Sequence, residues 1–75
     1  MLTVVELISK LSVEGRRSLA ATINDEDILD ILAQDESKFV REAAISNIAT
    51  RIETVNNALK DEAYVVRRAA EKKNL

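Results

Sequence analysis

Residues 35–44 read Asp-Glu-Ser-Lys-Phe-Val-Arg-Glu-Ala-Ala, and residues 61–70 read Asp-Glu-Ala-Tyr-Val-Val-Arg-Arg-Ala-Ala. The second stretch begins 26 residues after the first and keeps the acidic pair, the Val-Arg pair and the Ala pair. A repeat of this length is one supersecondary unit, which buries its apolar face by stacking on neighbouring units. The sequence therefore predicts a repeat protein.

Length and composition place the whole chain, residues 1–75, in one small domain. A domain of this size buries only about 60% of its unfolded surface, so its stability is marginal. The sequence has no Cys and no His, which leaves neither disulfides nor the usual metal ligands to stabilise it. Pro is absent and Gly15 is the only glycine, which argues against strands joined by tight turns.

Capping signals divide the chain into six expected helices. Thr3 and Thr50 are each followed three residues later by Glu, the spacing of a capping box. The expected N-caps are Thr3, Ser12, Asn24, Asp35, Thr50 and Asp61. We expect helices over 3–10, 13–23, 25–34, 36–48, 51–60 and 62–73, which pair into three helical hairpins.

Apolar residues recur at helical spacing within these segments and predict the core. The small residues of the two Ala pairs favour close approach of neighbouring helix axes. The expected stripes comprise Leu19, Ala20, Ile23, Ile28, Leu29, Leu32, Phe39, Val40, Ala43, Ala44, Ile48, Ile52, Val55, Leu59, Val65, Val66, Ala69 and Ala70.

The first repeat is degenerate. When Arg16 is aligned with Arg41, Gly15 falls at the position of Val40 and most other residues differ. A degenerate terminal repeat is expected where it serves as a cap. The predicted repeat units are residues 1–23, 24–48 and 49–75.

The phrase beginning at Asp35 and its copy beginning at Asp61 resemble the HEAT-like helical repeats and the leucine-rich repeat variant family. In both, a loop Asp precedes a Val-Arg pair and small residues. The stretch 32–35, Leu-Ala-Gln-Asp, and the later Asn47 resemble the variant family in particular. The resemblance implies an all-α, right-handed α-solenoid. It also implies a ladder of capping and ion-pair contacts between layers, made by Asp35, Asp61, Arg41 and Arg67.

Two charged clusters are candidate interaction sites. The first is an acidic run without Lys or Arg, formed by Asp25, Glu26, Asp27, Asp30, Asp35 and Glu36. It is interpreted either as helix caps with a solvated face or as a patch that attracts a basic partner. The second is the basic cluster of the last helix, formed by Arg67, Arg68, Lys72 and Lys73. It is interpreted as a solvated helix end or as a phosphate contact. For Arg41 and Arg67, ligand binding is the alternative to the ladder.

The residues exclude most other classes of function. Without His, Cys, a nucleophile elbow or a Gly-rich loop, we expect no enzyme, and we expect no cofactor or metal. The net charge of −2 makes nucleic acid an improbable partner, and no apolar run is long enough for a membrane span. We expect a cytoplasmic location.

The sequence therefore favours a protein-interaction or scaffold module. The alternative is a nucleic-acid-binding repeat that uses its basic last helix. We also expect a weak homodimer, because Val65, Val66 and Ala69 lie on a last helix with no further repeat to cover it.

Overall fold

The computed structural model describes residues 1–74, which form six α-helices and no strand. The helices are α1 (Val4–Ser9), α2 (Val13–Thr22), α3 (Glu26–Leu32), α4 (Lys38–Ser46), α5 (Ile52–Ala58) and α6 (Tyr64–Lys73). Each lies within one of the six ranges expected from the sequence, so the all-α prediction is confirmed. Leu75 of the expected third unit lies outside the described residues.

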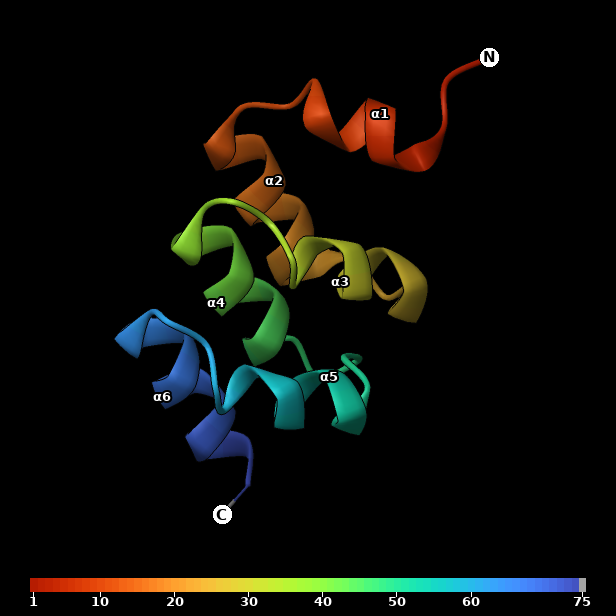
Figure 1. Cartoon of the computed structure of the whole chain (residues 1–75). Helices are drawn as coiled ribbons and strands as arrows, with labels where there is room; N and C mark the ends of the chain where they lie inside the picture. Colours follow the sequence, from red (N-terminus) through yellow and green to blue (C-terminus); the bar gives the residue numbers. More distant parts are fainter. Residues whose placement is uncertain (75) are drawn as a thin grey trace.

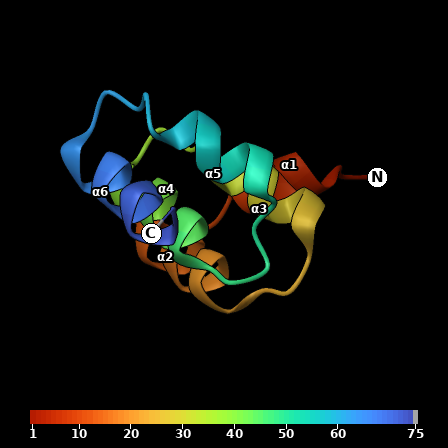
Figure 2. The ribbon, with the colours of Figure 1, turned by 90° about the horizontal axis from the view of Figure 1, so that it is seen from below.

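The helices are arranged in two columns (Figures 1 and 2). In one column α2 packs on α4 and α4 packs on α6, and these are the two most extensive contacts between helices. In the other column α3 and α5 lie beside α4 and α6 respectively. The molecule measures 41 × 20 × 17 Å. The pairs α1/α2, α3/α4 and α5/α6 are called the first, second and third hairpins below.

The core runs along the junction of the two columns. Leu29, Leu32, Val40, Ile45 and Val66 are its largest fully buried side chains. In the α2–α4–α6 column each helix also contributes one completely buried alanine, and these are Ala20, Ala44 and Ala70. A methyl side chain at these positions allows the short helices to pack closely, as their sequence predicted.

Four residues of the predicted stripes lie at the surface instead. Ile48 is 93% exposed and Ile52 is 73% exposed, and Phe39 and Leu59 are also exposed. Ile48 is exposed because α4 ends at Ser46, two residues earlier than expected, so the helical phase does not carry Ile48 toward the core. Ile52 is the first residue of α5 and is not among the residues that form the core or pack against it.

Helix caps follow the prediction in the first hairpin. Thr3 forms the complete capping box with Glu6, and Ser12 caps α2 by accepting a hydrogen bond from the Gly15 N–H. In α3 the N-cap is Asp25 rather than Asn24.

The later predicted caps are wrong. Thr50 does not cap α5, because its hydroxyl donates to the Ala44 carbonyl at the end of α4. Asp35 and Asp61 also do not cap helices, because α4 and α6 begin three residues after them, with Ser37 and Ala63 at the N-cap positions. Each carboxylate instead closes a turn in the preceding loop, by accepting an N–H bond from the residue two positions later.

We predict that Leu32→Ala lowers the free energy of unfolding by about 2–5 kcal/mol, since this side chain is fully buried and its removal leaves a cavity. The matched control is Ile52→Ala, which removes a similar volume from an exposed position and is expected to change stability by less than about 0.5 kcal/mol. Urea denaturation followed by circular dichroism measures both. Equal losses from the two variants would contradict the assigned core.

Candidate interaction site

The hairpins are joined by a repeated arginine–aspartate contact. Arg16 of α2 donates from Nε to Oδ2 of Asp35 at 2.8 Å and from Nη2 to Oδ1 at 3.4 Å. Its Nη1 donates to the Leu11 carbonyl of its own hairpin at 2.7 Å. Each partner's side chain is only 9% exposed. The guanidinium therefore ties the first hairpin to the α3–α4 loop of the second.

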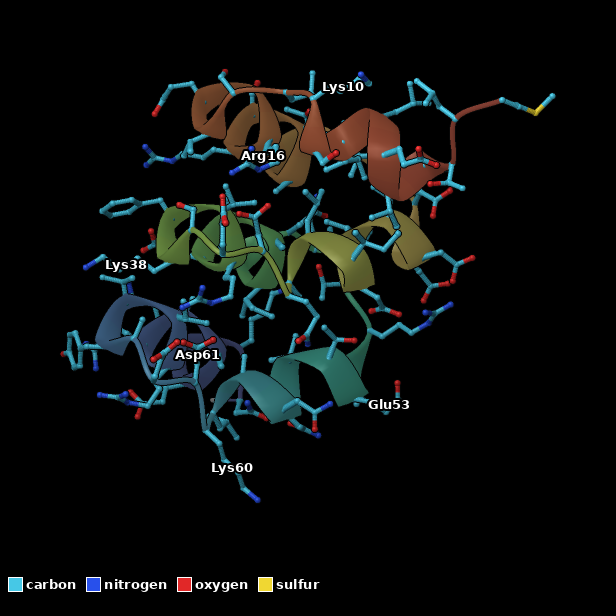
Figure 3. The ribbon with its side chains drawn as sticks, turned by 45° about the horizontal axis from the view of Figure 1, so that its top comes forward. Lys10, Arg16, Lys38, Glu53, Lys60 and Asp61 are labelled. Carbon is cyan, nitrogen blue, oxygen red and sulfur yellow. The ribbon has the colours of Figure 1, made fainter. Side chains whose placement is uncertain are left out.

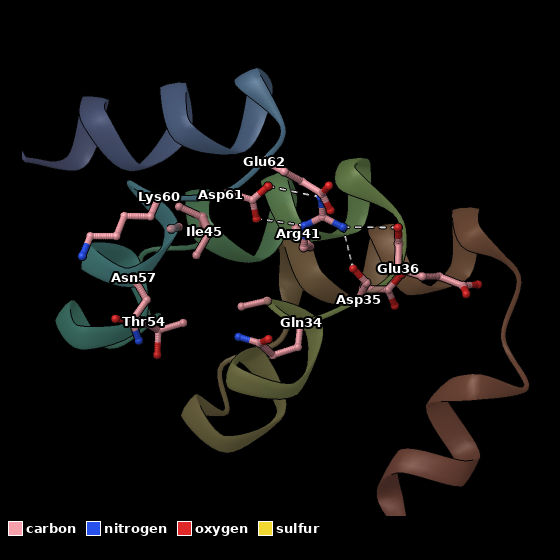
Figure 4. A pocket seen from close by; sticks show the side chains of 12 residues that line it. Gln34, Asp35, Glu36, Arg41, Ile45, Thr54, Asn57, Lys60, Asp61 and Glu62 are labelled. Atoms are coloured by element: carbon pink, nitrogen blue, oxygen red, sulfur yellow. Dashed lines mark hydrogen bonds and ion pairs between the residues drawn. The ribbon is translucent and has the colours of Figure 1, made fainter.

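The same contact recurs between the second and third hairpins. Arg41 of α4 donates from Nε to Oδ2 of Asp61 at 3.0 Å and from Nη2 to Oδ1 at 3.2 Å. Its Nη1 donates to the carbonyl groups of Asp35 and Glu36 in its own loop, at 2.7 and 3.2 Å. Figure 4 shows the guanidinium between the two loops, and Figure 3 shows Asp61 in the loop before α6. The pairs Arg16–Asp35 and Arg41–Asp61 are called the arginine–aspartate ladder below.

A second set of bonds runs along the opposite ends of the helices. Asn47 follows α4 and donates from Nδ2 to the carbonyl groups of Ala20 and Ile23 at the end of the first hairpin. Lys73 occupies the corresponding position of the third hairpin, and its Nζ donates to the Asn47 carbonyl. Partial burial lowers the pKa of the Lys73 ammonium below its usual value. Each layer is therefore fixed to the previous one at both ends of its second helix.

Arg67 reproduces half of this arrangement. Its Nη1 donates to the carbonyl groups of Asp61 and Glu62 at 2.7 and 3.0 Å, as Arg41 does in its own loop. The guanidinium lies 6.0 Å from the centre of the Tyr64 ring. Within residues 1–74, no carboxylate pairs with Arg67.

Much of the acidic run does not form a free patch for a basic partner, because its carboxylates contact other groups of the chain. Arg51 contacts Glu26, Asp27 and Asp30, at 3.7 Å, at 2.8 Å and through a short ion pair respectively. The hydrogen bond to Asp27, followed by the one to Asp30, raises the pKa of Arg51 above its ordinary value. The first residue of the run, Asp25, accepts two N–H bonds as the cap of α3. Much of the acidic charge is therefore committed to contacts within the chain.

Sequence reasoning missed the role of Arg51, which was assigned to the interior of a capping box. The residue follows the second hairpin but reaches back to α3, 21 to 25 positions earlier in the chain. The only local signal was the absence of Lys and Arg from residues 25–36, which implies that any compensating cation comes from elsewhere in the fold.

The four basic residues of α6 do not form one cluster. Arg67 faces the loop of its own hairpin, whereas Arg68, Lys72 and Lys73 line a shallow groove with Glu42. Arg68 lies 3.9 Å from Glu71, and Lys73 donates to the Asn47 carbonyl of the second hairpin. The structure thus separates Arg67 from the remaining cations by roughly 100° to 140° around the helix axis.

A larger groove lies over the loops of the second and third hairpins (Figure 4). It has a volume of about 630 Å³ and is lined by both partners of the Arg41–Asp61 contact. Other labelled residues around it are Gln34, Ile45, Thr54, Asn57 and Lys60. Its open shape and mixed polar lining suit a surface contact with another macromolecule better than the enclosure of a small ligand.

Exposed apolar residues gather at the first hairpin, not at the last helix. Within α1 the buried residue is Ile8, and the large apolar side chains around it are exposed. The exposed set at this end comprises Leu2, Val4, Val5, Leu7, Leu11 and Val13. Such a concentration of exposed apolar surface is characteristic of contact sites.

The surface expected to support a homodimer is not present at α6. Val66 is fully buried, Ala69 is buried and Val65 is partly buried against the core. These residues pack inward because α6 lies on α4 through this face. The exposed side chains of α6 are those of Tyr64, Arg68, Glu71, Lys72 and Lys73.

Within residues 1–74, no group of three or more acidic side chains is arranged to hold a metal ion. None of the helices in this range has the length and apolar composition that crossing a bilayer requires. Comparisons of the chain with protein-family models, with curated proteins and with solved structures give no match.

We predict that Asp61→Ala lowers the free energy of unfolding by about 3 kcal/mol, because it leaves the largely buried Arg41 guanidinium without its counter-ion. Asp61→Asn keeps an acceptor for the Ala63 N–H and should have a smaller effect. The control is Asp27→Ala, whose carboxylate is exposed and whose loss should have an effect below about 1 kcal/mol. Chemical denaturation ranks the three, and similar losses for Asp61→Ala and Asp27→Ala would contradict the ladder's importance.

Proposed function

We propose that this chain is a HEAT-like helical-repeat module, a right-handed α-solenoid of three hairpins, that binds another protein as an adaptor or scaffold. The 26-residue repeat supports this fold family, because equivalent Arg and Asp residues make equivalent contacts in successive layers. The proposal concerns binding alone and assigns no catalytic step to the chain.

The observation that carries the function is the apolar surface of the first hairpin. Val4, Val5 and Leu7 lie on a short helix that leaves about half of each side chain's surface in water. Exposure of so many large apolar side chains on one end of a small domain is unfavourable unless a partner covers them. A protein surface with its own apolar groove is the partner that best matches a short amphipathic helix.

The basic last helix gives less support to the nucleic-acid alternative. Arg67 and Lys73 donate to carbonyl groups of the chain itself, and Arg68 lies near Glu71. The four cations of α6 lie on different sides of the helix and two of them already donate to backbone carbonyl groups, so they provide a weak footprint for a phosphate backbone. Phe39 and Tyr64 are both exposed, but each has an Arg or Lys group over its ring.

A photo-crosslinking residue in place of Leu7 tests the proposed contact in the cells that produce the protein. We expect a discrete protein adduct from this position and none from the control position Glu53, which is exposed on α5. Val5→Glu places a charge in the contact and should weaken binding of the purified partner by roughly tenfold or more.

Equal labelling from positions 7 and 53, or an affinity unchanged by Val5→Glu, would contradict this assignment. Retention on a heparin column that falls steeply with added salt would support the nucleic-acid alternative instead.

A further inference from the structure

The outer end of the arginine–aspartate ladder is formed by Arg67. In Arg41, the bonds from Nη1 to its own loop orient the guanidinium so that Nε and Nη2 meet the carboxylate of the next hairpin. Nη1 of Arg67 donates to the equivalent carbonyl groups of its own loop, those of Asp61 and Glu62, at nearly the same distances. Arg67 is therefore held in the orientation that binds a carboxylate in the two complete rungs.

The donors that bind aspartate in those rungs are unpaired at Arg67. Within residues 1–74, its Nε and Nη2 groups have no hydrogen-bond acceptor. A guanidinium presents these two donors in parallel and matches both oxygens of one carboxylate. Because neighbouring backbone bonds already fix the side chain, a ligand here would meet a preorganised site.

The surrounding face suits a partner that binds and dissociates. Ile45 is buried where the third hairpin covers α4, and the repeat places Glu71 at the corresponding position of α6. Glu71 is exposed, as are Arg68 and Lys72 beside it. This face therefore stays hydrated when uncovered, and its surplus of cations attracts an acidic loop.

We propose that Arg67 binds an aspartate in the interhelical loop of a separately folded helical-hairpin protein, which packs on α6 as α5 and α6 pack on α4. The proposal rests on the function proposed above and adds a second contact surface with a defined chemistry. The Arg16 rung favours a glutamate directly after that aspartate, because Glu36 approaches Arg16 at 3.8 Å beside the Asp35 contact.

A second copy of this chain is a poor occupant of the site. When the first repeat is aligned through Arg16, Lys10 takes the position of Asp35 and Asp61, and it lies at the outer surface of the first hairpin (Figure 3). Head-to-tail stacking would place this cation against Arg67. The two aspartates that have the right setting are already paired, with Arg16 and Arg41.

A tandem chain, in which a second copy of residues 49–74 follows residue 74, supplies the proposed ligand as a defined probe. In the appended copy, Asp61→Asn should lower Tm by about 4–8 °C, the shift expected for about 1 kcal/mol in a chain of this size. The same substitution in an Arg67→Gln background should give less than half of that shift. Arg68→Gln is the matched control and should leave the shift intact.

A shift that is independent of Arg67, or an appended hairpin that adds no helical circular dichroism, would overturn the proposal. Either result would show that α6 does not accept a hairpin through Arg67.

In the unextended chain, a photo-crosslinking residue at Glu71 identifies the natural occupant. An adduct with another protein, located within one helical turn of a loop aspartate and lost in Arg67→Gln, supports the proposal. An adduct with a second copy or with nucleic acid, or no adduct, overturns it. Labelling from position 7 without labelling from position 71 would reject this inference and leave the proposed function standing, whereas loss of both would reject both.

Discussion

The order of the layers depends on one kind of group, an arginine guanidinium held between two loops. One edge donates to carbonyl groups of the arginine's own hairpin and the other pairs with an aspartate of the next. Both charges are largely removed from water. Loss of either partner therefore leaves the other charge buried without a counter-ion, which carries a strong desolvation penalty. Such a pair adds little net stability compared with an apolar contact, but it specifies which loop lies against which helix.

The apolar core provides the stabilising free energy, and the arginine–aspartate ladder fixes how the layers are aligned. Val40, Ala44 and Val66 are fully buried in the α2–α4–α6 column, but the hydrophobic effect is non-directional and by itself leaves some freedom in how the helices are aligned. The bidentate pair at one end and the Asn47 amide at the other remove that freedom, because both have strict bonding geometry. Packing and register are thus provided by different residues of the same helices.

These two roles explain what could be predicted from the sequence. Helical periodicity and local caps identified six helices, Leu29, Leu32 and the capping box at Thr3, because those signals act within four residues. The repeat also indicated that Asp35 and Asp61 matter. The resemblance also implied ion pairs of these aspartates between layers, which the structure contains. Their predicted capping role was wrong, because a carboxylate three residues before a helix resembles an N-cap in the sequence alone. Arg51 was missed because its partners lie 21 to 25 positions earlier in the chain.

The two ends of the molecule differ in chemistry, and this difference follows from the repeat itself. The second and third layers each have a face that supplies arginine and a face that supplies aspartate, so a stack of identical layers of this kind would polymerise head to tail. The first hairpin of this chain cannot pair with such an arginine, because Lys10 replaces the aspartate there and α1 exposes apolar side chains. At α6 the arginine face is retained, but Glu71 replaces the buried isoleucine. The first hairpin therefore exposes apolar side chains and α6 exposes mainly charged ones, so the two ends of the molecule differ in chemistry.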